Sequence, residues 1–86
     1  MQHAGPKTLA SIEPLLERLR AVDGLVEKRP GVFYRRSKAC LHFHEEGSDV
    51  YADVRLDPGD DFVRCRVTTR SEQRGLVRDL LDAGTT

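Results

Sequence analysis

Residues 39–44, with the sequence ACLHFH, combine a thiol and two imidazoles within six positions. Alternate side chains of an extended strand point to opposite faces of a sheet, so Cys40, His42 and His44 would share one face and the apolar residues the other. Two histidines on one strand can hold a metal ion or take part in proton transfer, and a neighbouring carboxylate would orient the imidazole ring. This stretch therefore predicts a central strand with one chemically active face.

The next segment supplies a carboxylate for this face. Residues 50–56 alternate apolar and polar positions, which is typical of a half-buried strand, and a glycine-containing turn precedes them. The antiparallel register that follows places Asp53 opposite His42 and Tyr51 opposite His44. We therefore predict that the two histidines and Asp53 lie together on the face that is not part of the core.

Arginines surround this predicted cluster. A two-residue hairpin turn at residues 37–38 places Arg35 on the same face, and a last strand over residues 62–68, after an acidic Pro-Gly turn, places Arg66 beside Asp53. Guanidinium groups bind carboxylates and phosphates through paired hydrogen bonds. The predicted ligand-binding residues are Arg35, His42, His44, Tyr51, Asp53, Arg55, Arg64 and Arg66.

Two helices and one sheet would position this face. Residues 12–22 repeat apolar side chains at helical spacing, and residues 69–72 form a capping-box pattern before a second apolar stripe. Each helix has one apolar stripe and the sheet has one apolar face, so both helices should cover the same side. We predict an α+β two-layer sandwich, with an antiparallel meander of four to five strands and an N-terminal and a C-terminal helix on one face. It forms a single domain over residues 1–86, of which residues 1–10 are a loose lead-in.

Composition restricts the class of protein. Charged residues make up 33% of the 86 residues and hydrophobic residues 38%, which is typical of a soluble globular chain. No apolar run reaches membrane-spanning length and no signal-peptide pattern follows the N-terminus, so we predict a cytoplasmic protein without a membrane partner. The 14 basic and 14 acidic residues cancel, which argues against nucleic acid as the main partner. The two cysteines fit neither a zinc motif nor a disulfide.

One stretch resembles a known family. The predicted first helix is followed by DGLVEKRPGVFYR, then by a strand that ends in LHFH, and then by VYADVRL. This order is similar to the luciferase-like domain family of small bacterial proteins, over residues 12–56. The resemblance would place the His-x-His element of that family at His42 and His44 and its acidic position at Asp53, and it implies the fold described above.

Three functions are compatible with this face. The one we expect is a small non-catalytic binding module whose arginines and histidines recognise an acidic ligand or a protein partner, including a second copy of the chain in a homodimer. The first alternative is single-stranded nucleic acid binding, with Phe33 and Tyr51 stacking on bases and the arginines contacting phosphates. The second alternative is a metal-dependent enzyme at His42, His44 and Asp53. Because the arginines would repel a cation, we expect no resident metal. No second motif supports a Cys-His mechanism, so we also expect no other cofactor and no catalytic residue.

Overall fold

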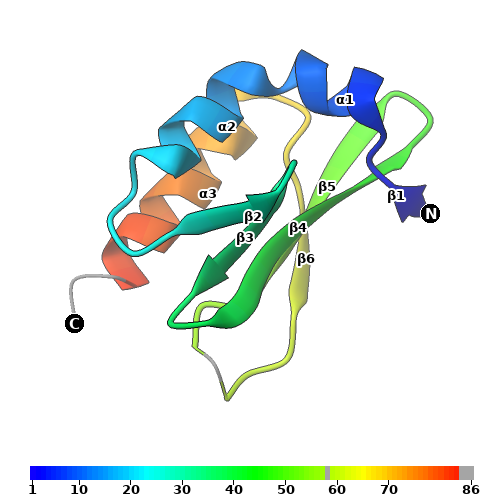
Figure 1. The fold of residues 1–86 in the computed structure, drawn as a ribbon. Coiled ribbons are helices and arrows are strands. Elements are labelled where there is room, and N and C mark those ends of the chain that lie inside the picture. The colour runs from blue at the N-terminus through cyan, green and yellow to red at the C-terminus, as the bar shows by residue number, and fades with distance from the viewer. Residues whose placement is uncertain (58, 84–86) are drawn as a thin grey trace.

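The computed structural model describes residues 1–57 and 59–83, which form a sheet with helices on one side (Figure 1). Residues 58 and 84–86, which include the proline of the predicted acidic turn, lie outside the described residues. In chain order the elements are β1 (Gln2–His3), α1 (Pro6–Ser11), α2 (Glu13–Arg20), β2 (Val26–Arg29), β3 (Val32–Arg35), β4 (Lys38–Glu46), β5 (Asp49–Val54), β6 (Val63–Arg66) and α3 (Arg70–Ala83). This arrangement confirms the predicted α+β class.

The sheet is an antiparallel meander in the order β2, β3, β4, β5, β6, with β1 added beside β4. β5 pairs with the second half of β4, so β1, which pairs with His44 and Glu45, must lie on the other edge of β4. β3 occupies that same edge but pairs with β4 only as far as Leu41. Among the described residues, this edge of β4 therefore has no strand partner in register at His42 and Phe43.

The core lies between the sheet and the helices. Helical spacing directs Leu15, Leu16 and Leu19 of α2 toward the sheet, and all three are buried. Leu80 of α3 and Phe33 of β3 are completely buried. Each such side chain contributes about 1.5 to 3 kcal/mol of hydrophobic stabilisation. The predicted capping box also forms, because Thr69 and Glu72 exchange hydrogen bonds of 2.9 and 3.2 Å at the start of α3.

The first ten residues contain two elements where the sequence predicts a loose lead-in. The N–H of Ala4 donates to the carbonyl of Phe43 at 3.1 Å, and the N–H of Gly5 donates to the Glu45 carboxylate at 2.7 Å. These bonds attach β1 and the start of α1 to β4. The predicted first helix, over residues 12–22, forms as α2. α1 is a separate helix before it, because Pro14 lacks an N–H and its ring would clash with the carbonyl four residues earlier in a continuous helix.

The hairpin between β3 and β4 differs from the prediction. Its turn residues are Arg36 and Ser37, both with positive φ (53° and 68°), instead of residues 37–38. The register then shifts between Phe33 and Tyr34, which leaves Cys40 as the extra residue of a β-bulge. As a result, Phe33 and Cys40 are buried in the core, whereas the predicted register placed them on the open face.

The register between β4 and β5 is the predicted one, and that between β5 and β6 is displaced by two residues. Asp53 pairs with Arg64 instead of Arg66. A displacement of two residues keeps every side chain on its predicted face, because strand side chains alternate with a period of two. The N–H of Val67 donates to the carbonyl of Val50 at 2.8 Å and fixes this offset. Among the described residues, no helix is long and apolar enough to cross a membrane.

Candidate functional site

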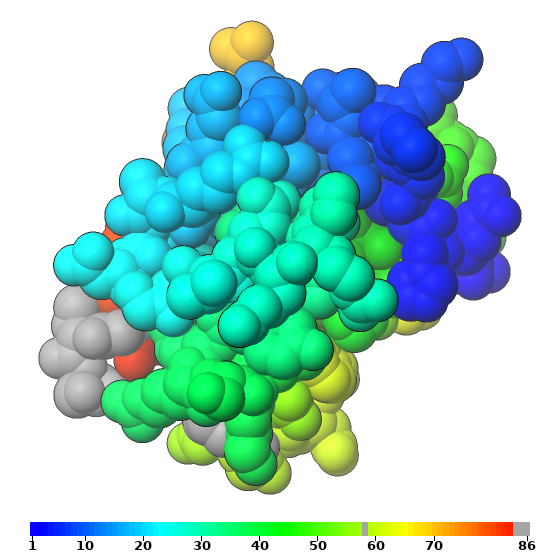
Figure 2. Space-filling view, viewed as in Figure 1, coloured from blue at the N-terminus to red at the C-terminus, as the bar shows by residue number. Residues whose placement is uncertain are grey.

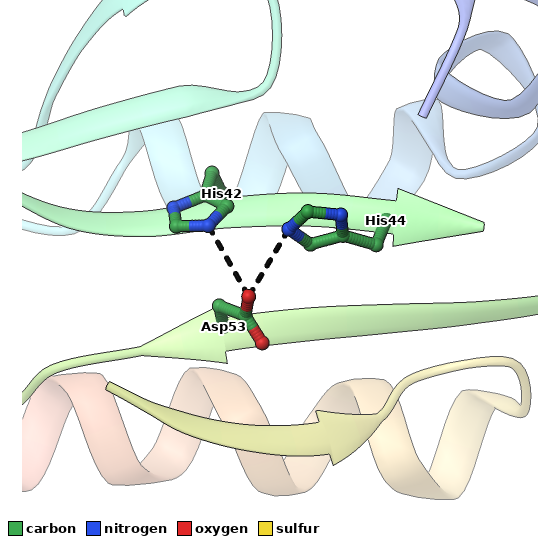
Figure 3. A group of neighbouring side chains, drawn as sticks. All are labelled: His42, His44 and Asp53. Carbon is green, nitrogen blue, oxygen red and sulfur yellow. Dashed lines mark ion pairs between the residues drawn. The ribbon is translucent and has the colours of Figure 1, made fainter. Parts of the chain in front are cut away.

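Three side chains from the two central strands converge on the face of the sheet that the helices leave open (Figure 3). The Nε2 atoms of His42 and His44 lie 3.2 and 3.1 Å from the same oxygen, Oδ2 of Asp53. One ligand atom from each of the three residues lies within 4.8 Å of the others. The structure therefore brings together the predicted cluster, and we call these three residues the His-His-Asp cluster.

The strands hold this cluster in a fixed place. His42 and His44 are two positions apart on β4, so both side chains leave the same face, and Asp53 is in register with His42 on β5. On the opposite face, Leu41 and Phe43 anchor β4 in the core. A site built on two paired central strands with a packed core behind them is rigid, which favours precise ligand geometry.

The contacts within the cluster do not satisfy the hydrogen-bonding capacity of His44. Both ring nitrogens of His44 are buried, and neither has a hydrogen-bond partner in the described part of the chain. The Nε2 atom of His44 is close to Asp53, but the contact lacks the alignment of a hydrogen bond. Leaving a buried polar group unpaired costs about 1 to 3 kcal/mol, so the arrangement favours a partner that can accept the lone pair of the Nε2 atom.

Arg64 fixes the carboxylate of the cluster. Its Nε donates to Oδ1 of Asp53 at 2.7 Å and its Nη2 to Oδ2 at 2.8 Å, a bidentate pair. This pair lowers the pKa of Asp53, while burial of the carboxylate opposes the shift. Only 8% of Asp53 is exposed, so its negative charge lies below the protein surface. The two hydrogen bonds from Arg64 fix the orientation of the carboxylate.

The protonation state of His42 favours metal binding. Burial lowers the pKa of His42, the Asp53 carboxylate opposes this shift, and the neighbouring His44 and His3 add to it. A neutral imidazole has a free lone pair, and metal ions bind only that form. At neutral pH the cluster therefore presents a neutral donor in His42 and an ionised carboxylate in Asp53.

Two aromatic residues that the sequence analysis did not select lie against the cluster. The ring of His3 on β1 stacks on His44, with a centroid distance of 4.6 Å and an interplanar angle of 29°. The ring of Phe62 approaches His42 edge-on at 5.1 Å. The alternation of strand side chains could have predicted Phe62, because it precedes Arg64 by two positions and therefore lies on the same face. No signal in the sequence connects His3 to the cluster.

The other predicted arginines and Tyr51 are outside the cluster. Arg66 pairs with Asp49 at 3.0 Å and with Glu72 at 2.9 Å. Arg35 donates to the carbonyl of Leu80 on α3 at 3.2 Å, and Arg55 donates to the carbonyl of Ala39 and lies over the ring of Phe62. Tyr51 is in register with His44. The arginines that the sequence assigns to ligand binding thus already have partners within the protein.

Neither cysteine supplies a reactive group to this face. Burial raises the pKa of the Cys40 thiol, and the positive charges of Arg35 and Arg55 only partly oppose it. Burial likewise raises the pKa of Cys65 on β6. Both cysteines are free thiols. They are therefore protonated at neutral pH and are poor nucleophiles.

A groove lies beside His42, where β3 and β1 leave the edge of β4 uncovered. Its volume is about 430 Å³, and His3, Arg29, Tyr34 and His42 are its polar lining residues. In Figure 2 the N-terminal residues (dark blue) and the β2–β3 hairpin (cyan to green) lie on either side of a narrow strip of β4. The groove gives a small molecule access to the cluster from one side.

Comparisons with known proteins give no further information on this site. No protein-family model matches the chain, and searches of curated proteins and of solved structures find no match. The resemblance to the luciferase-like domain family stays a prediction from the sequence. The proposals for function below rest on the geometry of the site.

Proposed function

We propose that this protein is a small metal-binding domain in which His42, His44 and Asp53 hold one divalent transition-metal ion on the open face of the sheet. The observation that supports the proposal is the approach of both Nε2 atoms to one carboxylate oxygen, together with the lack of any hydrogen-bond partner for the buried ring nitrogens of His44 among the described residues. Two imidazoles and a carboxylate suit Zn²⁺, Co²⁺, Ni²⁺ or Fe²⁺, whereas Ca²⁺ and Mg²⁺ prefer oxygen ligands.

The separations within the cluster fit such an ion. Ligand atoms about 2.0 to 2.2 Å from a common tetrahedral Zn²⁺ are about 3.3 to 3.6 Å apart, and the two nitrogen to oxygen distances, 3.2 and 3.1 Å, are within a few tenths of an ångström of this range. A cation between these atoms would use the lone pair of His44 Nε2, which lacks a hydrogen bond. Arg64 would keep its bond to Oδ1 of Asp53 and orient the carboxylate, as groups behind metal ligands commonly do.

The positive charges of the four arginines led us to expect no resident metal, and two of these charges are balanced by carboxylates in the structure. Arg64 is paired with Asp53, and Arg66 is paired with Asp49 and Glu72. An acidic ligand or a nucleic acid would have to separate these pairs before it could use Arg64 or Arg66. Recognition of either one stays a prediction from the sequence, and the geometry favours the metal ion.

Three protein ligands would leave coordination positions for solvent or for an anionic ligand. The groove beside His42 is the route by which such a ligand would approach. A bound cation would thus give the open face the net positive charge that its paired arginines do not supply. The proposed domain binds the ion, and no reaction is assigned to it.

The test is a titration of metal-free protein that carries no histidine tag. We expect one equivalent of Zn²⁺ by calorimetry, and an absorption band in the visible range when Co²⁺ replaces it. His42→Ala, His44→Ala and Asp53→Asn should each weaken binding by at least about tenfold. Tyr51→Phe, beside the cluster, is the matched control and should bind normally. Absence of binding, or unchanged affinity in a His42→Ala and His44→Ala double variant, would show that the proposal is wrong.

A further inference from the structure

A second surface lies along β6, the strand at one edge of the sheet. Within residues 1–57 and 59–83 this strand pairs only with β5, so the N–H and C=O groups that point to its outer edge have no neighbouring strand there. Strand alternation directs Leu56 and Val63 toward the core side, yet they are 42% and 67% exposed. The edge therefore combines free backbone groups with uncovered apolar side chains, which is characteristic of interaction sites.

A groove of about 440 Å³ accompanies this edge, between β6 and α3. Its apolar lining residues are Val54, Leu56, Val63, Cys65 and Leu76. Its acidic lining residues are Asp60, Asp61 and Asp79. None of these three carboxylates has an ion pair with a described residue. The groove is thus an apolar surface bordered by three unbalanced negative charges.

We propose that this groove and the free edge of β6 bind an extended peptide segment of a partner protein by strand addition. Backbone hydrogen bonds to the edge would supply affinity, and alternate side chains would supply specificity. Side chains on the helix side of the added strand would lie near Val63 and the three carboxylates. This side therefore selects apolar residues together with lysine or arginine, whose aliphatic stems cover apolar surface while their charges reach the carboxylates.

The opposite side of the added strand has different neighbours. Its side chains would lie beside Arg64 and Arg66, whose guanidinium groups are held by carboxylates of the protein. Basic residues there would be repelled by the two arginines, and acidic residues would compete with the carboxylates that hold them. Small neutral residues avoid both effects. The partner segment is thus one in which apolar or basic residues alternate with small neutral ones. The inference does not depend on the metal ion, because the groove and the His-His-Asp cluster share no residue.

The test uses the complete ¹⁵N-labelled protein and the probe peptide acetyl-Lys-Thr-Val-Thr-Lys-amide. We expect the largest amide shifts in β6 at Arg64 and Arg66, whose N–H groups point to the free edge. Val63 and Cys65 have the same parity as Val67, which donates to Val50, so their N–H groups point to β5. Replacing both lysines of the peptide with glutamate should weaken binding at least about tenfold, because like charges are then opposed. Replacing both threonines with proline should also weaken it, because proline removes the N–H groups that pair with the edge.

Variants of the protein separate this proposal from general attraction of a basic peptide. Asp60→Asn, Asp61→Asn and Asp79→Asn together should remove the preference for the lysine peptide, while Asp23→Asn, in the exposed loop after α2, should keep it. Equal binding of the lysine and glutamate peptides, or an unchanged preference in the triple variant, would overturn the proposal. So would self-association that shifts the same β6 amides in the protein alone, since the occupant would then be a second copy.

Discussion

At the scale of single residues, the charged carboxylate of Asp53 is the common partner of the other side chains at the site. Its carboxylate accepts two hydrogen bonds from Arg64 and lies against both imidazoles of the cluster. A buried charge of this kind is tolerated only because its partners compensate for lost hydration. Removing the charge should therefore affect both the stability of the apo protein and its binding of metal.

We predict that Asp53→Asn lowers the free energy of unfolding of the metal-free protein by about 2 to 4 kcal/mol, because it leaves the Arg64 charge without its partner and places an amide NH₂ group beside donors. Urea denaturation measures this change. The control is Asp49→Asn. Asp49 lies on β5 like Asp53, but its carboxylate is more exposed and pairs with Arg66, so this change should cost less than about 1 kcal/mol. Equal losses in the two variants would contradict the role of Asp53.

At the scale of elements, one ion network joins α2 to the edge of the sheet. Arg20 at the end of α2 contacts Glu13 in the same helix and Glu27 on β2, both at 2.6 Å. Glu27 also accepts a hydrogen bond from the N–H of Gly31 at 2.9 Å. The hydrogen bond from Arg20 is the largest cause of the lowered pKa of Glu27, and burial opposes it.

This network predicts a pH dependence of stability. Because the pKa of Glu27 is lower in the folded chain than in the unfolded chain, its contribution is fully present above the unfolded value of about 4.3 and is lost as the pH falls through the folded value. Glu27→Gln should therefore lower the urea midpoint at pH 7 and flatten the decline of stability below about pH 4. Glu17→Gln, on the outer face of α2, is the control. An unchanged acid profile in Glu27→Gln would contradict this interpretation.

At the scale of the whole molecule, the two proposed binding surfaces lie on different parts of one small sheet. The His-His-Asp cluster is on the open face of the central strands, and the acidic groove lies at the β6 edge. Arg64 is the structural connection between them, because it extends from β6 to Asp53. A chain of 86 residues has a modest core, so a bound ion should contribute measurably to its stability.

We predict that Zn²⁺ raises the melting temperature of the protein. At a free concentration 100 times the dissociation constant, an ion that binds only the folded state stabilises it by about 2.7 kcal/mol. For a domain of this size that corresponds to a rise of roughly 10 to 20 °C. A chelator should reverse the shift, Ca²⁺ should not produce it, and the His42→Ala and His44→Ala double variant should not respond to Zn²⁺. A shift that persists in the double variant would place the ion elsewhere.

The sequence by itself determined the layers, the faces of β5, of β6 and of β4 from Leu41 onward, and the central part of the site. Apolar spacing of about 3.6 residues defined the helices, and a spacing of two defined which strand residues face the core. The short turn between β4 and β5 then left one register, so the pairing of His42 with Asp53 followed from residues close in the chain. The capping box of α3 is equally local, and the structure confirms it.

Tertiary structure alone decided the residues that complete the site. Strand alternation fixes a face but not the offset between strands, and the connection from β5 to β6 is long enough to permit several offsets. Packing and the bond from Val67 to Val50 selected the one that places Arg64 at Asp53. Burial of Phe33 and Cys40 required a bulge that alternation does not encode. His3 reaches the cluster only because β1 pairs with β4 across about forty residues of sequence, a contact that no local pattern predicts.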